Sequence, residues 1–131
     1  MSDYRDEVLL QPFAAATVLQ ACEGGDDTAF AAATALVRRN QPVLLAGMGS
    51  SYAAALYGAV LLGRRRIFAC AGEAADLLYY ADGFAEQFRT LVAISQSGAS
   101  VETLSLAQRA AGSLHLVAVT SWPTSPLASL P

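Results

Sequence analysis

Hydroxyl side chains cluster in the segment Ser95-Gln96-Ser97-Gly98-Ala99-Ser100, which holds three serines and a glutamine. An apolar run precedes this segment and a helical pattern follows it. Free backbone N–H groups at a helix start favour an anion, hydroxyl and amide groups add neutral donors, and Gly98 lets the backbone come close. The segment therefore predicts a phosphate site. The alternative is that Ser97 or Ser100 only caps the helix, with Glu102 favourable to its dipole.

A second turn, Gly47-Met48-Gly49-Ser50-Ser51, combines glycines and serines after another apolar run. Its G-x-G spacing suggests a dinucleotide site, but Tyr52 stands where the fingerprint needs its third glycine. The next predicted strand also ends without the acidic residue that would bind a ribose. The sequence contains no lysine, which excludes a P-loop and a lysine Schiff base. We therefore expect no cofactor.

Composition narrows the function further. The chain has 131 residues, of which 54% are hydrophobic and 15% charged, and this predicts one folded domain. A net charge of −3 argues against nucleic acid as the main partner, and no apolar run is long enough to span a membrane. One histidine, His115, and two distant cysteines, Cys22 and Cys70, exclude a metal site of several such ligands. Reduced cysteines and the lack of a basic leader indicate a cytoplasmic protein.

Hydrophobic periodicity and turn residues predict alternating helices and strands. Helices are expected over residues 5–22, from Asp26 or Asp27 as a cap through Arg39, and over residues 52–62, 73–81 and 101–111. Strands are expected over residues 43–46, 66–71, 90–94 and 114–120. This order predicts an α/β sandwich of three layers, with a parallel sheet of four strands and helices on both faces. We count one domain, in which residues 1–41 form a helical segment packed on residues 42–131.

Ligands of such sheets bind at the carboxyl ends of the strands, near the point where the strand order reverses. Both serine-containing turns fall at predicted carboxyl ends. The sequence therefore places one candidate site at this edge of the sheet.

Four runs of the chain resemble the sugar isomerase (SIS) domain family: GMGSSYAAAL, AGEAADLLYY, ISQSGASVETL and VTSWPTSPLASL. The signature S-x-S-G-x-[ST]-x-E-T is matched throughout, by Ser95, Ser97, Gly98, Ser100, Glu102 and Thr103. The likeness is greatest to the isomerase part of glucosamine-6-phosphate synthase and to related phosphosugar isomerases and deaminases. It implies a flavodoxin-like fold, a sugar phosphate as ligand and a role in aminosugar metabolism.

The resemblance also implies roles for individual residues. The phosphate would be held by the hydroxyl and amide groups of the two turns, namely Ser50, Ser95, Gln96, Ser97 and Ser100. Gly49 and Ser51 would face the sugar, and Glu73 would support the site.

Domains of this family normally continue past a segment like Ser125–Ala128 into a further strand and helix. The acid–base groups of the isomerases lie in that later part, so we expect a truncated domain without strong isomerase activity of its own. Glu73 and Glu102 remain as candidates for a catalytic base. His115 lies early in a predicted strand, away from the ligand end, and is expected to be structural.

Two functions from different classes stay open. The first is phosphosugar binding as the N-terminal SIS part of an aldose–ketose isomerase or of an aminosugar-phosphate isomerase or deaminase. The second is a non-catalytic module for phosphosugar sensing or assembly. A flavodoxin-like nucleotide-binding protein fits less well, because the serine-rich turn suits a monophosphate better than a pyrophosphate. The surplus of apolar residues favours a homodimer or a higher homo-oligomer.

Overall fold

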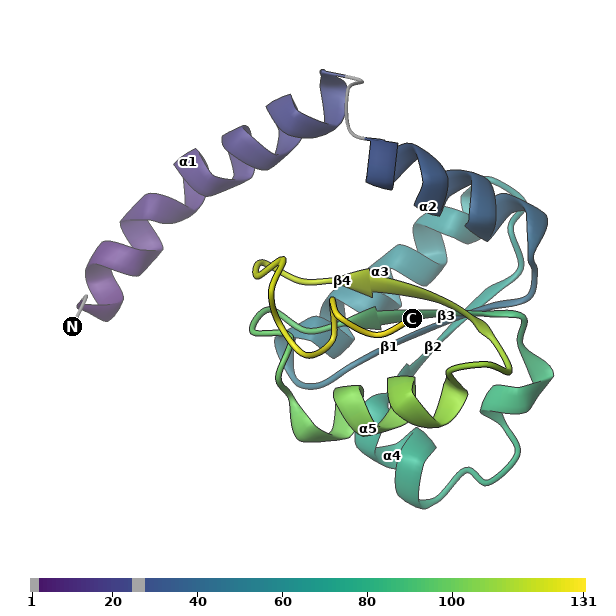
Figure 1. Ribbon diagram of the computed structural model, residues 1–131. Helices are drawn as coiled ribbons and strands as arrows, with labels where there is room; N and C mark the ends of the chain where they lie inside the picture. The colour runs from purple at the N-terminus through teal and green to yellow at the C-terminus, as the bar shows by residue number, and fades with distance from the viewer. Residues whose placement is uncertain (1–2, 25–27) are drawn as a thin grey trace. The chain divides into compact units, whose positions relative to one another are not determined.

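A computed structural model describes residues 3–24 and 28–131 (Figure 1). The chain divides into two compact units, Met1–Ala35 and Leu36–Pro131. The first unit contains helix α1 (Tyr4–Glu23), which continues through Pro12, and most of helix α2 (Thr28–Arg39). Asp3 precedes α1, and its side chain accepts a hydrogen bond from the Arg5 N–H. The predicted caps Asp26 and Asp27 lie outside the described residues.

The second unit is built on a parallel sheet of four strands. These are β1 (Val43–Gly47), β2 (Ala69–Glu73), β3 (Thr90–Ile94) and β4 (His115–Val119), and they lie in the order β2-β1-β3-β4. Three helices flank the sheet, α3 (Ser50–Arg64), α4 (Ala74–Tyr79) and α5 (Val101–Ala110), with a short 3₁₀ turn η1 at Ala85–Gln87. The predicted α/β fold with a parallel sheet is thereby confirmed.

Helices cover the sheet from two sides (Figure 1). Helix α3 packs on one face, where Val43, Leu45 and Val92 form an apolar cluster with Ala55 of the helix. Helices α4 and α5 pack on the other face, against Leu44 and other inward residues of the sheet. The central strands β1 and β3 are almost wholly buried, as expected of parallel strands covered on both faces.

The order of the strands reverses at β1. From β1 the chain crosses to β2 on one side and then returns to β3 on the other side of β1. Gly47 at the end of β1 pairs in register with Ile94 at the end of β3. The turns that follow these two strands therefore begin next to each other, at the place where α/β sheets bind ligands.

Strand β2 begins three residues later than predicted, because the chain after α3 is still turning. The Arg66 N–H donates to the Gly63 carbonyl at 2.9 Å, and the Ile67 N–H donates to the Leu62 carbonyl at 3.0 Å. Arg66 has a φ of +60°, so this is a Schellman-type helix end with arginine at the position that usually holds glycine. Without a glycine the sequence gives little sign of the turn.

Helix α3 begins two residues earlier than predicted, at Ser50. Gly49 has a φ of +54° and reverses the chain after β1. The Ala53 N–H then donates to the Gly49 carbonyl at 3.1 Å, which starts the helical ladder. Ser50 and Ser51 consequently belong to the first turn of the helix rather than to a preceding loop. The other predicted elements agree with the structure within two residues.

Candidate functional site

The serine turn, residues 95–100, is shaped by its own backbone. Gly98 has a φ of +64°, and its N–H donates to both the carbonyl and the Oγ of Ser95, at 3.0 and 3.1 Å. The Ala99 N–H donates to Ser97 Oγ at 3.2 Å. Ser95 is only 4% exposed, whereas Gln96 and Ser97 are exposed. The turn thus buries one hydroxyl as a support and presents the next two side chains outward.

The serines of this turn do not cap helix α5. Ser100 occupies the N-cap position, but its side chain makes no capping hydrogen bond. The Oγ of Ser97 accepts from Ala99, which lies before the helix. The first helical hydrogen bond runs from the Leu104 N–H to the Ser100 carbonyl, so the N–H groups of residues 101–103 precede the ladder. The structure therefore does not support capping as the reason for these serines.

The turn after β1 is built in a similar way. Gly49 stands at the N-cap position of α3, where no side chain caps the helix. Ser50 is exposed at the first position of the helix and Ser51 is half-buried behind it. The Ser51 N–H donates to the Met48 carbonyl at 3.0 Å. This turn adds two hydroxyl groups and a second helix N-terminus to the carboxyl edge of the sheet.

Gly47 is the point where the two turns touch. A Cβ at this position would lie 2.8 Å from the carbonyl carbon of Ser51 and 2.9 Å from the Ile94 carbonyl oxygen. Only glycine allows both groups to come so near. The structure therefore brings together the residues to which the family resemblance gives roles toward the phosphate and the sugar, which are Gly49, Ser50, Ser51, Ser95, Gln96, Ser97 and Ser100.

Residues 120–127, which follow β4, support the serine turn through hydrogen bonds to its main-chain carbonyl groups. The sequence analysis did not predict this role. Thr120 Oγ1 and the Ser121 N–H both donate to the Gln96 carbonyl, at 3.3 and 3.1 Å. The Leu127 N–H donates to the Gly98 carbonyl at 3.0 Å, and Leu127 is 1% exposed. This segment also follows the carboxyl end of a strand, and that position was a signal that could have pointed to it.

The site offers neutral donors rather than cations. The arginines of residues 36–131 lie in the last turns of helices or just before strands, at the opposite edge of the sheet: Arg38, Arg39, Arg64, Arg65, Arg66, Arg89 and Arg109. An anion bound at the serine turns would be held by hydroxyl groups, amides and two helix N-termini.

Carboxylates flank the site on both sides. Glu73 ends β2, so the second strand ends in an acidic residue, contrary to the sequence prediction. Glu73 pairs in register with Gly47, and Glu102 lies in the first turn of α5. Both are half-buried. His115 begins β4 and its N–H donates to the Arg89 carbonyl, which places it at the far edge of the sheet. The structure therefore leaves Glu73 and Glu102, but not His115, near the serine turns.

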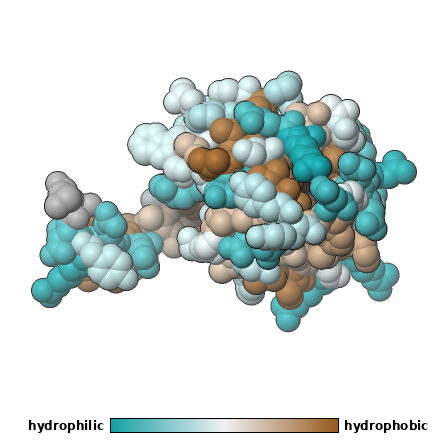
Figure 2. Space-filling model, turned by 90° about the horizontal axis from the view of Figure 1, so that it is seen from below, coloured by the Kyte–Doolittle hydropathy of each residue, from teal (hydrophilic) through white to brown (hydrophobic). Residues whose placement is uncertain are grey.

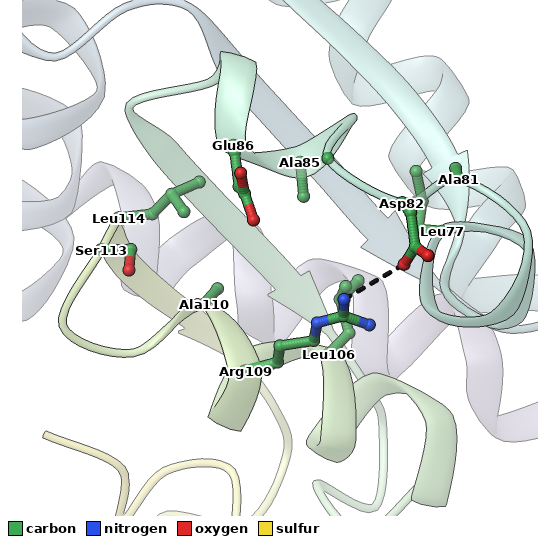
Figure 3. Close-up of a pocket in the computed structure, with 11 residues that line it drawn as sticks. Leu77, Ala81, Asp82, Ala85, Glu86, Leu106, Arg109, Ala110, Ser113 and Leu114 are labelled. Atoms are coloured by element: carbon green, nitrogen blue, oxygen red, sulfur yellow. Dashed lines mark hydrogen bonds and ion pairs between the residues drawn. The ribbon is translucent and has the colours of Figure 1, made fainter.

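A separate small cavity of about 50 Å³ lies at that far edge, between α4, η1 and α5 (Figure 3). Arg109 of α5 points toward Asp82 beside it, and their Nη2 and Oδ1 atoms are 3.1 Å apart. Glu86 adds a second carboxylate. The cavity is well below the roughly 300 Å³ of a small-molecule site, and its carboxylates would repel an anion.

Two other kinds of feature are absent from the part of the chain that the structure describes. Within residues 3–24 and 28–131 no three His, Cys, Asp or Glu side chains are grouped so that they could hold a metal ion. In the same ranges, no helix combines the length and the apolar character needed to cross a membrane.

The SIS domain family matches residues 26–131, which include both serine turns and their supporting segment. The chain belongs to the SIS domain family. No curated protein matches the chain. Several solved structures match the chain, at sequence identities that establish a common fold.

An Escherichia coli CFT073 protein in complex with arabinose 5-phosphate aligns with a TM-score of 0.72 and 20% identity, over 97% of this chain and 70% of that one. A Bacteroides fragilis protein, described as a candidate phosphosugar isomerase of capsule formation, aligns with a TM-score of 0.66 and 24% identity. The alignment covers 77% of this chain and 57% of that one. The tagatose-6-phosphate ketose/aldose isomerase of E. coli aligns with a TM-score of 0.62 and 17% identity. The alignment covers 85% of this chain and 31% of that one. The SIS chain therefore spans little more than half the length of some of its structural neighbours.

Proposed function

We propose that this SIS domain binds a sugar phosphate at the two serine turns, as part of an aldose–ketose isomerase. The observation that carries the proposal is the serine turn itself, whose exposed hydroxyl groups stand at a helix start without capping it. Its place at the reversal of strand order is where such sheets bind small molecules. Two structural neighbours support the reaction class: the E. coli isomerase acts on tagatose 6-phosphate, and the CFT073 protein holds arabinose 5-phosphate.

The phosphate would lie between the starts of α5 and α3. Ser97 and Gln96 are exposed and would donate directly, and Ser50 would donate from the other turn. The Oγ atoms of Ser95 and Ser100 already accept hydrogen bonds, from Gly98 and Thr103. Half-buried Ser100 would donate its hydroxyl hydrogen to the phosphate, whereas Ser95, which is 4% exposed, would hold the turn in the shape that receives it. Gly49 and Ser51 would lie on the side of the sugar.

Isomerisation needs a base that moves a proton between C1 and C2 of the open-chain sugar. Glu73 and Glu102 are the carboxylates nearest to the proposed site, and we propose them as the groups to test. We expect slow turnover from residues 1–131 alone, because neither carboxylate is paired with a second acid–base group. The finer assignment, to a glucosamine or fructose 6-phosphate isomerase or deaminase, rests on the sequence resemblance.

Thermal unfolding with added ligand tests the binding. Arabinose 5-phosphate, fructose 6-phosphate and glucosamine 6-phosphate would be compared with inorganic phosphate and NAD. A ligand that binds the native state raises the melting temperature by mass action. Ser97→Ala should weaken sugar-phosphate binding roughly tenfold, the loss expected for one hydrogen bond to a charged group.

Ser113→Ala is the matched control, since Ser113 is an exposed serine that lines the small cavity at the opposite edge. It should leave the ligand-induced shift unchanged. A shift that neither serine affects, or no shift with any sugar phosphate, would contradict the proposed site.

The sensing or assembly module remains the second candidate, because no complete acid–base pair lies in the described part of the site. The two functions differ in one measurement. An isomerase exchanges the C2 hydrogen of the sugar phosphate with deuterium from D₂O, which proton NMR detects. A sensor would show the thermal shift but no exchange.

A further inference from the structure

The two serine turns supply hydroxyl and amide groups to the candidate site, but no aromatic side chain. Met48, the one large apolar side chain of these turns, packs against the α5 core. The groups beside them, Glu73 and Glu102, are carboxylates. Sites for small molecules are lined mainly by apolar and aromatic side chains, and a few polar groups fix the orientation of the ligand. An aromatic residue is therefore expected next to the serine turns.

Trp122 lies beside the serine turn, on the segment that follows β4. The Ser95 N–H donates to the Val119 carbonyl at 3.0 Å, and the Ser121 N–H donates to the Gln96 carbonyl at 3.1 Å. Trp122 is therefore one residue, about 3.8 Å along the chain, from a direct contact with the serine turn. Its side chain is 59% exposed.

The other exposed aromatic side chains of the second compact unit lie away from this edge of the sheet. They stand in the middle of α3, before β2 and at the end of α4, namely Tyr57, Phe68, Tyr79 and Tyr80. Figure 2 shows the side of α4 and α5, where apolar side chains are interspersed with polar ones, as on an ordinary solvated surface. Within this unit, Trp122 is therefore the exposed aromatic residue at the ligand edge.

The main chain of Trp122 is fixed on both sides. Its N–H donates to Thr120 Oγ1 at 3.2 Å, and the same hydroxyl group donates to the Gln96 carbonyl at 3.3 Å. Its carbonyl accepts from the Ser125 N–H at 3.0 Å, which closes a turn with Pro123 at the second position, where proline sets the required φ. Trp122 is thus held in place relative to Gln96 before a ligand arrives, and this lowers the entropy cost of binding.

The indole ring of Trp122 is not used by the fold. Within residues 3–24 and 28–131, Trp122 belongs to neither apolar cluster, and its indole N–H makes no hydrogen bond. A tryptophan offers an apolar face and one donor, and the donor is normally bonded when the ring is covered. A sugar presents the complementary groups, which are C–H bonds for the face and hydroxyl groups for the N–H.

The order of the strands sets the two sides of a ligand at this edge. The serine turn after β3 lies between the turn after β1 and the segment after β4. Neighbouring strands are about 5 Å apart, so β1 and β4 are about 10 Å apart. One sugar that contacts both sides at about 4 Å each fits this distance. A phosphate at the serine turn would therefore leave its sugar between Ser51 and Trp122.

We propose that Trp122 forms an aromatic wall of the sugar site and favours ligands that carry a carbon chain on the phosphate. This inference rests on the proposed function, because it needs the phosphate at the serine turn. The ring packs against C–H groups of the sugar, and its N–H donates to a sugar hydroxyl group. Trp122 binds and orients the sugar, and it takes no part in proton transfer.

The fluorescence of Trp122, the single tryptophan, tests the contact directly. In the full chain without ligand, acrylamide should quench the fluorescence strongly, because the indole is exposed. Saturating arabinose 5-phosphate or fructose 6-phosphate should protect the indole from quenching, and inorganic phosphate should not. An indole that is already shielded in the free chain, or one that bound sugar phosphate leaves unprotected, would overturn the proposal.

Calorimetric titration of variants separates sugar binding from support of the turn. Trp122→Ala keeps the main-chain hydrogen bonds, so it should leave the affinity for inorganic phosphate unchanged and weaken sugar-phosphate binding roughly tenfold. Trp122→Phe keeps an aromatic face and should weaken it only about threefold. Tyr80→Ala is the matched control, at an 85% exposed aromatic residue at the end of α4, and should change neither affinity.

The outcomes separate this inference from the proposed function. Sugar-phosphate binding that Ser97→Ala weakens and Trp122→Ala does not would sustain the proposed function and overturn the aromatic wall. An equal loss of affinity for inorganic phosphate and sugar phosphate in Trp122→Ala would show that the residue only supports the turn, which also overturns the wall. If the wild type binds none of the sugar phosphates, the proposed function fails and the wall fails with it.

Discussion

Gly98 allows the serine turn to be tested by stability alone. Its φ of +64° lies in the left-handed region, and a Cβ there would overlap the side chain of Ser125 and lie 2.8 Å from Thr120 Oγ1. Ser125 is buried, and the neighbouring Leu127 is tied to the Gly98 carbonyl. We expect Gly98→Ala to push the segment 120–127 away from the turn.

The expected cost has two parts. A left-handed alanine costs about 1–2 kcal/mol relative to glycine, and displacing a packed buried group costs about 1–3 kcal/mol. Gly98→Ala should therefore lower the free energy of unfolding by about 2–5 kcal/mol, a large share of the roughly 5–15 kcal/mol of an ordinary domain. Gly112 has a φ of +83° with nothing within 4 Å of its Cβ position, so Gly112→Ala should cost only the first part.

Urea unfolding measures both variants. Circular dichroism follows the helices, and the fluorescence of Trp122, the single tryptophan, follows the C-terminal segment. Adding Ser125→Gly to Gly98→Ala should recover part of the loss, because it removes the overlapping side chain. If Gly98→Ala costs no more than Gly112→Ala, then Ser125 does not pack against the turn and the described site geometry is wrong.

Three further substitutions separate core contacts from surface contacts, all measured by urea unfolding. Leu127→Ala should cost about 2–4 kcal/mol, because Leu127 is 1% exposed in the α5 core; a cost under about 1 kcal/mol would mean that the C-terminal segment is not docked. Thr90→Val should cost about 1 kcal/mol through the lost 2.8 Å hydrogen bond to the Asn40 carbonyl, and no cost would contradict that bond. Asp82→Asn should change the free energy of unfolding by less than about 0.5 kcal/mol, because the ion pair with Arg109 is exposed. A larger loss would mean that this ion pair is not the surface contact described.

The sequence predicts the fold where apolar runs and turn residues agree. Residues 43–46 and 90–94 read as buried strands because they are apolar without interruption, and they form the two central strands. The sequence places the serine turn between an apolar strand and a helix over residues 101–111, and the structure has the helix over Val101–Ala110. Both predictions depend only on the residues of the segment itself, and not on contacts with distant parts of the chain.

Other features depend on groups that the sequence does not mark. The start of β2 was misplaced because Arg66 adopts a left-handed conformation that sequence rules assign to glycine. The support from Thr120 and Leu127 was missed because it consists of hydrogen bonds to main-chain carbonyls. Any residue could provide such an acceptor, so no side-chain pattern reveals it.

The order of the strands explains why two turns that are far apart in the sequence lie next to each other in the structure. Neighbouring strands lie about 4.8 Å apart. If β3 had paired outside β2, the turn after β1 and the serine turn would be separated by a further strand. In the observed order Gly47 pairs with Ile94, and the absence of a side chain at Gly47 lets Ser51 and Ile94 approach to contact. The sequence contains both turns, but only the sheet makes them adjacent, so that the N-termini of α3 and α5 lie at the same edge of the sheet, on its opposite faces.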